Sequence, residues 1–315
     1  MNTIITASPA EAAAILNAGG LVAFPTETVY GLGARFDSES SVRSIFEAKG
    51  RPADNPLIIH VWNTNQIGKI SSGQSESALV LIEAFFPGPI TLVLSKHGSV
   101  APIVTAGLDT VGVRMPDHQL ASAFLEACEA PVAAPSANQS GRPSPTSWGA
   151  VLEDLDGKID CVLKGESSRF GLESTVVDCT GVDPVVLRPG SIGIEDLRLV
   201  VPGTSFPAGD DATMKRSPGT RHRHYQPRVP VKLVDGPIAK RANNTLAYIG
   251  IDQPEEPLVY DEIELVSEKD EYARALFSFF RRCEKLDIGA IHCQKVDEVG
   301  IGKALMDRLA KASSD

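Results

Sequence analysis

The sequence of 315 residues contains few cysteines, and their spacing is irregular. There are five, Cys128, Cys161, Cys179, Cys283 and Cys293, and no two are separated by the Cys-x-x-Cys interval. Disulfide frameworks and zinc sites need cysteines at short, defined intervals. We therefore predict reduced, buried thiols, and neither a disulfide framework nor a structural zinc site.

Long apolar runs and targeting signals are also absent. No stretch approaches the roughly 18 apolar residues that a membrane span needs. The first residues have no basic start followed by an apolar core, and Glu11 is unfavourable in a transit peptide. The sequence predicts a cytoplasmic protein without a membrane partner.

Basic residues are outnumbered by acidic ones. Lys and Arg total 30, Asp and Glu total 40, and the formal net charge is −10. A surface this acidic disfavours non-specific binding of nucleic acid, although a local basic patch remains open. The apolar content of 43% is enough for a large core, and the length fits two domains.

Several well-known catalytic motifs are missing. The segment Val-Gly-Ile-Gly-Lys-Ala at 299–304 has Asp297 in place of the first glycine of a phosphate-binding loop and lacks its terminal Ser or Thr. We interpret it as the start of the last helix. His222 and His224 lie in the basic run Arg-His-Arg-His, which favours a phosphate-facing or solvated loop over a metal site.

Strand and helix patterns alternate through residues 1–204. Ser8 is a predicted N-cap with Pro9 at the first helical position, and residues 38–49 carry apolar side chains at helical spacing. We expect an α/β (α+β-like) domain around one twisted mixed sheet. Its strands are expected at 3–6, 21–24, 57–61, 90–94, 111–115, 132–134, 159–163, 175–178 and 185–187.

The composition changes near residue 205. Residues 214–232 contain six Lys or Arg and no Asp or Glu, which we interpret as part of an ordered linker or lid over 205–232. Residues 233–315 then alternate between strands and helices, which predicts a smaller, Rossmann-like domain with a parallel sheet. Its strands are expected at 245–249, 258–260 and 288–292, with helices at 302–312 and from Glu268, where Ser267 is the predicted N-cap.

Cationic and polar residues gather at strand and helix ends. Lys49 and Arg51 lie at the end of a helix, and Arg114 and Arg188 each lie at a strand end near a proline. Such cations often only complement a helix dipole or face solvent. Four of them in an acidic chain favour a shared anion pocket, because each charge-assisted hydrogen bond contributes about 1.5–3 kcal/mol. The polar loop at 135–145 could hold phosphate or ribose oxygens, or be an ordinary turn.

These residues stand in recognisable motifs. Residues 26–34, 49–60, 86–94, 111–117, 134–138 and 174–178 resemble the motifs of the YrdC-type threonylcarbamoyl-AMP synthase family. Residues 217–227 are similar to the linker of its two-domain branch, which has a C-terminal Rossmann-like domain. Thr220 and Gln226 depart from the family pattern there, while the tyrosine and basic residues are kept.

The resemblance implies a nucleotidyltransferase that condenses L-threonine, bicarbonate and ATP to L-threonylcarbamoyl-AMP and pyrophosphate. Mg²⁺ would enter with ATP, with no metal ligand assigned to the protein. The product would pass to a tRNA threonylcarbamoyl-transferase complex for N6-threonylcarbamoyladenosine formation in ANN-decoding tRNAs, and direct contact with tRNA is left open. The linker would fold over the pocket and exclude water from the adenylate.

The matching positions imply the site residues. Lys49 and Arg51 would be catalytic, stabilising charge on the phosphorus and the leaving pyrophosphate. L-Threonine and its carbamate would lie among Thr28, His60, Arg114, Ala134 and Ser174. ATP would be held by Arg51, Asn55, Thr110, Ser136, Asn138, Ser144, Arg188 and Tyr225.

Two other functions fit some of the same features. A basic hollow could bind RNA or tRNA without catalysis. A carbamoyltransferase of the hydrogenase-maturation kind uses a similar domain, but it also carries an acylphosphatase-like domain and zinc fingers, which this sequence lacks. The C-terminal domain could serve as a sensor or docking unit, and its sequence indicates no ligand.

Overall fold

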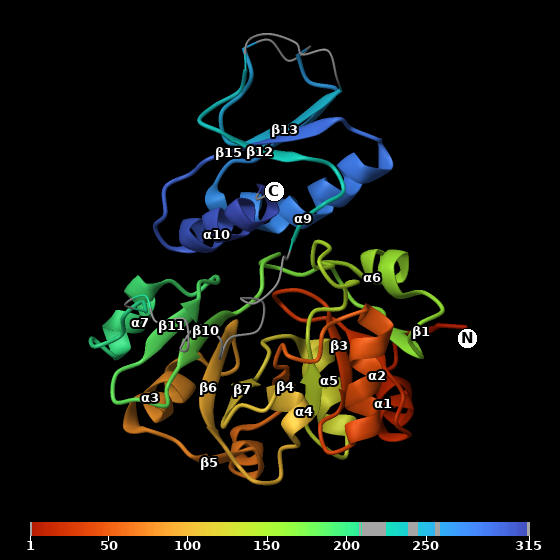
Figure 1. The fold of residues 1–315 in the computed structure, drawn as a ribbon, viewed down its shortest axis with the longest axis vertical. Helices are drawn as coiled ribbons and strands as arrows, with labels where there is room; N and C mark the ends of the chain where they lie inside the picture. The colour runs from red at the N-terminus through yellow and green to blue at the C-terminus, as the bar shows by residue number, and fades with distance from the viewer. Residues whose placement is uncertain (1, 208, 210–224, 239–244, 256–258, 314–315) are drawn as a thin grey trace.

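The computed structural model describes residues 2–207, 209, 225–238, 245–255 and 259–313. Its strands form an eleven-stranded sheet in the N-terminal part of the chain and a separate four-stranded sheet in the C-terminal part. Figure 1 shows the smaller unit above the larger one, with its helices on the side that faces the larger unit.

The large sheet is mixed, as the sequence predicts. Its strands are β1 (Ile4–Thr6), β2 (Val22–Phe24), β3 (Gly31–Arg35), β4 (Ile58–His60), β5 (Ser71–Gly73), β6 (Ile90–Lys96), β7 (Thr110–Arg114), β8 (Val132–Ala134), β9 (Cys161–Leu163), β10 (Thr175–Asp178) and β11 (Val185–Arg188). They are ordered β1-β9-β2-β3-β8-β4-β7-β6-β10-β11, with β5 paired to β6. Strand β4 is parallel to β7, β6 is antiparallel to β7 and parallel to β10, and β10 is antiparallel to β11. As a result, the C-terminal ends of β4, β7 and β11 and the start of β10 lie at the same end of the sheet.

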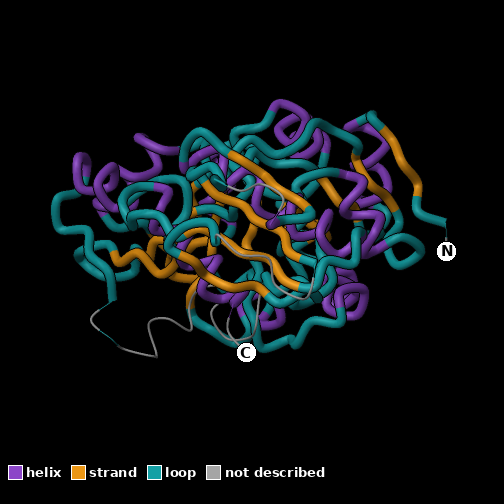
Figure 2. The backbone as a smooth tube through the Cα atoms, turned by 90° about the horizontal axis from the view of Figure 1, so that it is seen from above, coloured by secondary structure: helices purple, strands orange, loops and turns teal. Residues whose placement is uncertain are grey.

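Helices cover both faces of this sheet, and Figure 2 shows most helices around a centre of strands. They are α1 (Pro9–Asn17), α2 (Glu39–Lys49), α3 (Glu76–Phe85), α4 (Pro102–Thr105), α5 (Gln119–Ala127), α6 (Trp148–Leu155) and α7 (Ile194–Val200), with a 3-10 helix at Thr64–Lys69. Helices α1 and α5 pack on one apolar cluster, and α2, α3, α4 and α6 on the other. The predicted N-cap is confirmed, since the Ser8 side chain accepts from the N–H of Glu11.

The end of helix α2 sets up the cavity described below. Ser38 caps its start, and Gly50 ends it in the left-handed conformation at φ 59°. A glycine adopts this conformation without the steric cost that a Cβ brings. The chain therefore reverses directly after Lys49 and enters the segment that leads to β4.

The C-terminal unit has a parallel sheet, as predicted. Strands β12 (Val231–Val234), β13 (Leu246–Gly250), β14 (Glu262–Leu265) and β15 (Ala290–Gln294) are ordered β12-β15-β13-β14. Helices α9 (Lys269–Lys285) and α10 (Ile301–Ser313) pack on it through one large apolar cluster. The start of α10 at Ile301 confirms that the 299–304 segment opens the last helix.

Two local predictions in this unit are wrong. The strand expected at 258–260 is absent at Val259 and Tyr260, and the strand forms instead at Glu262–Leu265, where alternating Glu and apolar residues suit a partly exposed edge. Ser267 is not the N-cap of α9. Glu268 takes that position, while the backbone N–H and the hydroxyl of Ser267 both donate to Glu271.

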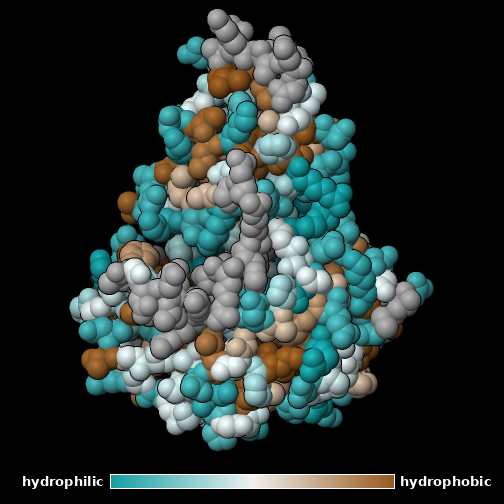
Figure 3. All heavy atoms as spheres, in the orientation of Figure 1, coloured by the Kyte–Doolittle hydropathy of each residue, from teal (hydrophilic) through white to brown (hydrophobic). Residues whose placement is uncertain are grey.

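Predictions about the cysteines, the linker and membrane-spanning segments can be compared with the structure in part. All five cysteines are buried and free, as predicted. His222, His224 and residues 210–224 of the predicted linker lie outside the described residues. Within the described ranges, no helix has the length and apolar composition needed to cross a bilayer. Figure 3 shows apolar residues scattered among hydrophilic ones on the face it presents.

The two units meet in a close contact. Gly171 has φ +77°, and a Cβ built on it would lie 2.5 Å from the Cα of Arg274 on α9. Arg281, also on α9, donates to both carboxylate oxygens of Asp154 in the large unit, at 3.0 and 2.8 Å. Asp154 also accepts from Arg142 at 2.6 Å, so a buried ionic network joins the two units.

Candidate active site

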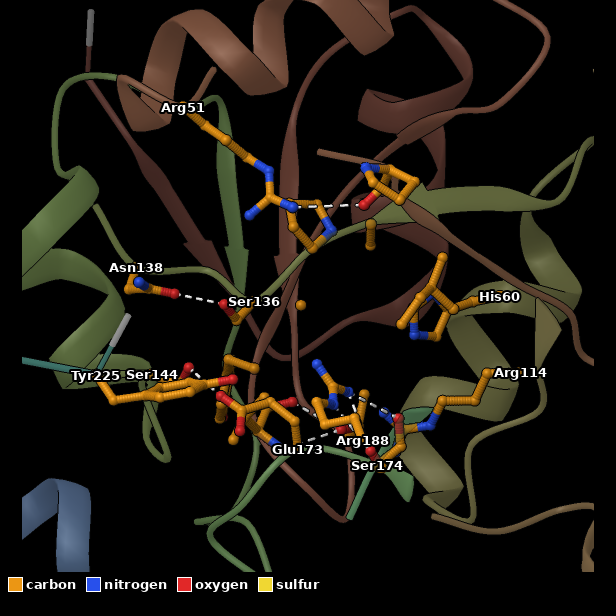
Figure 4. A pocket seen from close by; sticks show the side chains of 18 residues that line it. Arg51, His60, Arg114, Ser136, Asn138, Ser144, Glu173, Ser174, Arg188 and Tyr225 are labelled. Carbon is orange, nitrogen blue, oxygen red and sulfur yellow. Dashed lines mark hydrogen bonds between the residues drawn. The ribbon is translucent and has the colours of Figure 1, made fainter. Parts of the chain in front are cut away.

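A cavity opens where the strand ends of the large sheet meet the C-terminal unit. It encloses about 640 Å³ of empty space, its open mouth included. Figure 4 shows labelled side chains surrounding this space from several sides. The lining residues are Thr26, Val29, Tyr30, Gly31, Arg51, Pro56, Ile58, His60, Arg114, Ala134, Pro135, Ser136, Asn138, Ser144, Glu173, Ser174, Arg188 and Tyr225.

Three guanidinium groups reach this cavity from separate parts of the chain. Arg51 follows α2, Arg114 ends β7 and Arg188 ends β11, and all three line the same space. The pKa of Arg51 is lowered to about 10, mainly by burial, so the group stays charged at neutral pH. The sequence prediction that these cations share a pocket is confirmed for these three.

Arg114 and Arg188 are fixed by neighbouring groups. Arg114 Nη2 donates to Glu27 Oε1 at 2.7 Å in a buried ion pair. Arg188 donates through Nε and Nη2 to the carbonyl oxygen of Ser174, at 3.2 and 3.0 Å. Side chains held in this way keep their orientation without a ligand, which lowers the entropy cost of binding an anion.

Lys49 has a different position from the three arginines. It is 1% exposed, does not line the cavity, and its Nζ donates to the carbonyl oxygens of Ser136, at 2.6 Å, and of Asn138. Burial, with Arg51 nearby, lowers the pKa of its ammonium well below the usual value. Lys49 therefore supports the 135–145 loop from behind.

That loop presents polar groups to the cavity. The Ser136 hydroxyl donates to Asn138 Oδ1 at 2.5 Å, and Asn138 Nδ2 donates to the carbonyl oxygens of Gln139 and Arg142. Ser144 donates to Glu173 Oε1 at 2.5 Å. These bonds account for the folded shape of the loop and place Ser136, Asn138 and Ser144 in the wall of the cavity.

The opposite side of the cavity holds a neutral imidazole. His60 is 4% exposed and contacts the Phe24 ring edge-on at 5.5 Å. Burial, and next the charge of Arg114, lower its pKa to about 3, so it carries no charge at neutral pH. His60 and Arg114 are neighbours across the β4–β7 pairing. A neutral ring beside a cation leaves that cation available to a carboxylate.

The remaining predicted residues divide into two groups. Ala134, Ser174 and Tyr225 line the cavity. Four residues, Lys49, Thr28, Asn55 and Thr110, are not among its lining residues. Thr28 is fully buried one step behind it, with its hydroxyl 2.9 Å from that of Thr26, which does line it.

The sequence reasoning missed two carboxylates. Glu27 pairs with Arg114, and Glu173 lines the cavity, bonded to Ser144 and to Arg308 of the C-terminal unit. Burial alone would raise the pKa of Glu173, but Arg308 and Arg188 outweigh it and hold the pKa below its usual value. Their positions in the sequence were the available signal, since Glu27 lies inside the 26–34 motif next to Thr28, and Glu173 directly precedes the 174–178 motif and Ser174.

Comparison with known proteins shows the family to which the chain belongs. A family model described as "Telomere recombination" (Sua5_yciO_yrdC) matches residues 14–190, and a second, "Threonylcarbamoyl-AMP synthase, C-terminal domain", matches residues 192–314. The chain belongs to the two-domain, Sua5-type threonylcarbamoyl-AMP synthase family. Its members named below are nucleotidyltransferases, and this chain is an enzyme of that type.

Relatives in this family resemble the chain over nearly its whole length. The threonylcarbamoyl-AMP synthase of Pyrococcus abyssi is 44% identical over 96% of this chain and 93% of its own, and that of Bacillus subtilis is 38% identical over 96% and 92%. The crystal structure of P. abyssi Sua5 complexed with L-threonine superposes with a TM-score of 0.90, at 41% identity, over 99% of this chain and 97% of that one.

Proposed function

We propose that this enzyme condenses L-threonine, bicarbonate and ATP to L-threonylcarbamoyl-AMP and pyrophosphate in the cavity described above. Its product would serve N6-threonylcarbamoyladenosine formation in ANN-decoding tRNAs, after transfer to a tRNA threonylcarbamoyl-transferase complex. The observation that supports the proposal most strongly is the convergence of Arg51, Arg114 and Arg188 on one cavity in a chain of net charge −10. Such a local concentration of cations suits a ligand with several negative charges.

The first chemical step joins two of the substrates. The threonine ammonium group and bicarbonate give a carbamate, with loss of water and a proton. Arg114 is suited to the threonine carboxylate, because guanidinium–carboxylate bonds are strong and directional. The neutral ring of His60 and the hydroxyl of Ser174 can exchange hydrogen bonds with the polar groups of threonine without competing for Arg114.

The second step transfers the adenylyl group. A carbamate oxygen attacks the α-phosphorus of ATP, the new P–O bond forms, and the bond to pyrophosphate breaks. Arg51 and Arg188 stabilise the charge that develops on the phosphoryl and pyrophosphate oxygens. The 135–145 loop contributes the hydroxyls of Ser136 and Ser144, each of which would turn its proton from its partner, Asn138 or Glu173, toward an ATP oxygen. Catalysis is then mostly positioning and electrostatic stabilisation.

Mg²⁺ enters this proposal only as a partner of ATP. Among the described residues, no group of three His, Cys, Asp or Glu side chains is placed to hold a metal ion. The carboxylate in the cavity wall, Glu173, is engaged by Ser144 and Arg308. The part of the chain that the structure describes therefore offers no such metal site, and neither step above depends on one.

The decisive experiment follows both products. The enzyme is incubated with ATP, Mg²⁺ and bicarbonate, with L-threonine, with L-serine or with no amino acid. We expect threonine-dependent release of pyrophosphate in equal amount to an adenylate identified by mass. Arg188→Gln should lose both products, whereas Arg43→Gln, which alters an exposed i,i+4 ion pair with Glu39, should retain them. Absence of the adenylate from the wild-type reaction would overturn the proposal.

A further inference from the structure

A buried arginine of the C-terminal unit contacts the wall of the active-site cavity. Arg308, on α10, is 0% exposed. Its Nε donates to Glu173 Oε2 at 2.9 Å, and its Nη2 donates to the carbonyl oxygen of Pro189 at 3.2 Å. Glu173 and Arg188, the residue before Pro189, both line the cavity. A helix of one unit thus fixes two neighbouring segments of the wall in the other.

The same unit also holds Tyr225. The guanidinium of Arg308 lies 5.1 Å from the centroid of the Tyr225 ring, and Phe277 of α9 stacks on that ring at 5.6 Å with an interplanar angle of 18°. Tyr225 lines the cavity, as Figure 4 shows beside Ser144 and Glu173. The ring is therefore positioned by two side chains of the C-terminal unit.

Charge makes Arg308 important for an anionic ligand. Among the described residues that line the cavity, Glu173 is the one carboxylate. Its charge is compensated by Arg308 and Arg188, both of which contribute to its lowered pKa. Without Arg308, an ionised carboxylate would face the phosphates of a nucleotide with less compensation. Arg308 itself does not line the cavity, so it acts through its neighbours.

We propose that Arg308 is a positioning residue for ATP: it neutralises Glu173 and orients Tyr225, so that the C-terminal unit determines the nucleotide affinity of a cavity in the N-terminal unit. The inference rests on the function proposed above and gives the C-terminal unit a specific part in it. It concerns ATP rather than L-threonine, because Ser144, Glu173 and Tyr225 stand together on the side of the cavity away from His60 and Arg114 (Figure 4).

The test measures KM for ATP and for L-threonine separately, from initial rates of pyrophosphate release. Arg308→Met should raise KM for ATP by about tenfold or more, equivalent to about 1.4 kcal/mol, because a carboxylate with less compensation would then face the phosphates in a partly buried site. KM for L-threonine should stay within about twofold. Adding Glu173→Gln to Arg308→Met should bring KM for ATP back to within about threefold of the wild-type value, because it removes the unpaired charge.

Two further variants separate this role from simple support of the fold. Arg308→Lys keeps a cation beside Glu173 and should retain most of the ATP affinity, even if Arg308→Met folds poorly. Lys285→Met removes an exposed ion pair between the units, Lys285 to Glu153, and should leave both KM values unchanged. Circular dichroism and calorimetric ATP binding are measured for each variant.

The outcomes are distinct. Equal losses for ATP and L-threonine without rescue by Glu173→Gln, or an unchanged KM for ATP in folded Arg308→Met, would overturn the inference. Equal loss in Arg308→Lys and Arg308→Met would also count against it. Each of these results presupposes a wild-type enzyme that makes the adenylate. Failure of the wild-type enzyme to do so refutes the proposed function instead.

Discussion

Lowering the pH should reveal the buried, uncharged state of His60. Burial, and next Arg114, lower the pKa of this imidazole from 6.5 to about 3 in the folded protein. Between these values the unfolded chain binds a proton that the folded protein does not. The stability therefore rises with pH from about 3 to about 6.5 and is lost as the pH falls through that range.

The size of the effect follows from the shift. The whole change in pKa corresponds to a free energy of unfolding on the order of 5 kcal/mol, of which about 2 kcal/mol should be lost by pH 5. His118 and His292, whose pKa values are also lowered mainly by burial, add losses of the same sign. A comparison with His60→Asn cancels those losses, because both proteins keep these two residues.

Urea unfolding at pH 8, 6.5 and 5 provides the assay. The free energy of unfolding of the wild-type protein should fall more steeply than that of His60→Asn, by about 2 kcal/mol between pH 8 and 5. His97→Asn, which removes an exposed imidazole, is the matched control. The His60 ring proton, assigned in NMR spectra by its loss in His60→Asn, should not titrate between pH 8 and 5. Parallel stability curves, or a His60 midpoint near 6.5, would refute the reasoning.

Three other changes test the support of the cavity. Glu27→Ala leaves the buried Arg114 unpaired and should cost about 3–5 kcal/mol in urea unfolding, with a raised KM for L-threonine; a loss below about 1 kcal/mol contradicts this. Lys49→Met removes the donor to the Ser136 carbonyl and should cost about 1–3 kcal/mol and raise KM for ATP, whereas unaltered ATP kinetics would mean that the loop holds its shape unaided. Tyr225→Ala should weaken ATP binding and increase the ratio of AMP to adenylate in mass spectra, and an unchanged ratio and affinity would argue against shielding by this residue.

Much of the fold could be predicted because its signals are local. The Ser8 cap and the glycine that ends α2 act within one helical turn, and the sequence pattern identifies them directly. The strand at Glu262–Leu265 was missed because its charged, partly exposed residues resemble a surface loop, and its pairing with β13 is a tertiary interaction.

The candidate site likewise combines features that the sequence predicted with contacts that it could not predict. Four cationic residues at strand and helix ends of an acidic chain indicated a shared pocket, and three of these four cations line it. The position of Lys49 behind the loop could not be predicted, because the carbonyl groups it binds lie 87 and 89 residues further along the chain. The partners of Glu173 are similarly distant, since Arg308 follows it by 135 residues. Such pairs depend on how the two units dock.

The close approach at Gly171 limits how the two units can evolve. Any side chain at this position would clash with α9, since its Cβ would overlap the backbone of Ala273 and Arg274. Pushing α9 outward would carry Phe277 away from the Tyr225 ring on which it stacks. The close approach of the two units thus requires the one amino acid that has no side chain, and a single added methyl group there would loosen the Tyr225 side of the cavity from a distance.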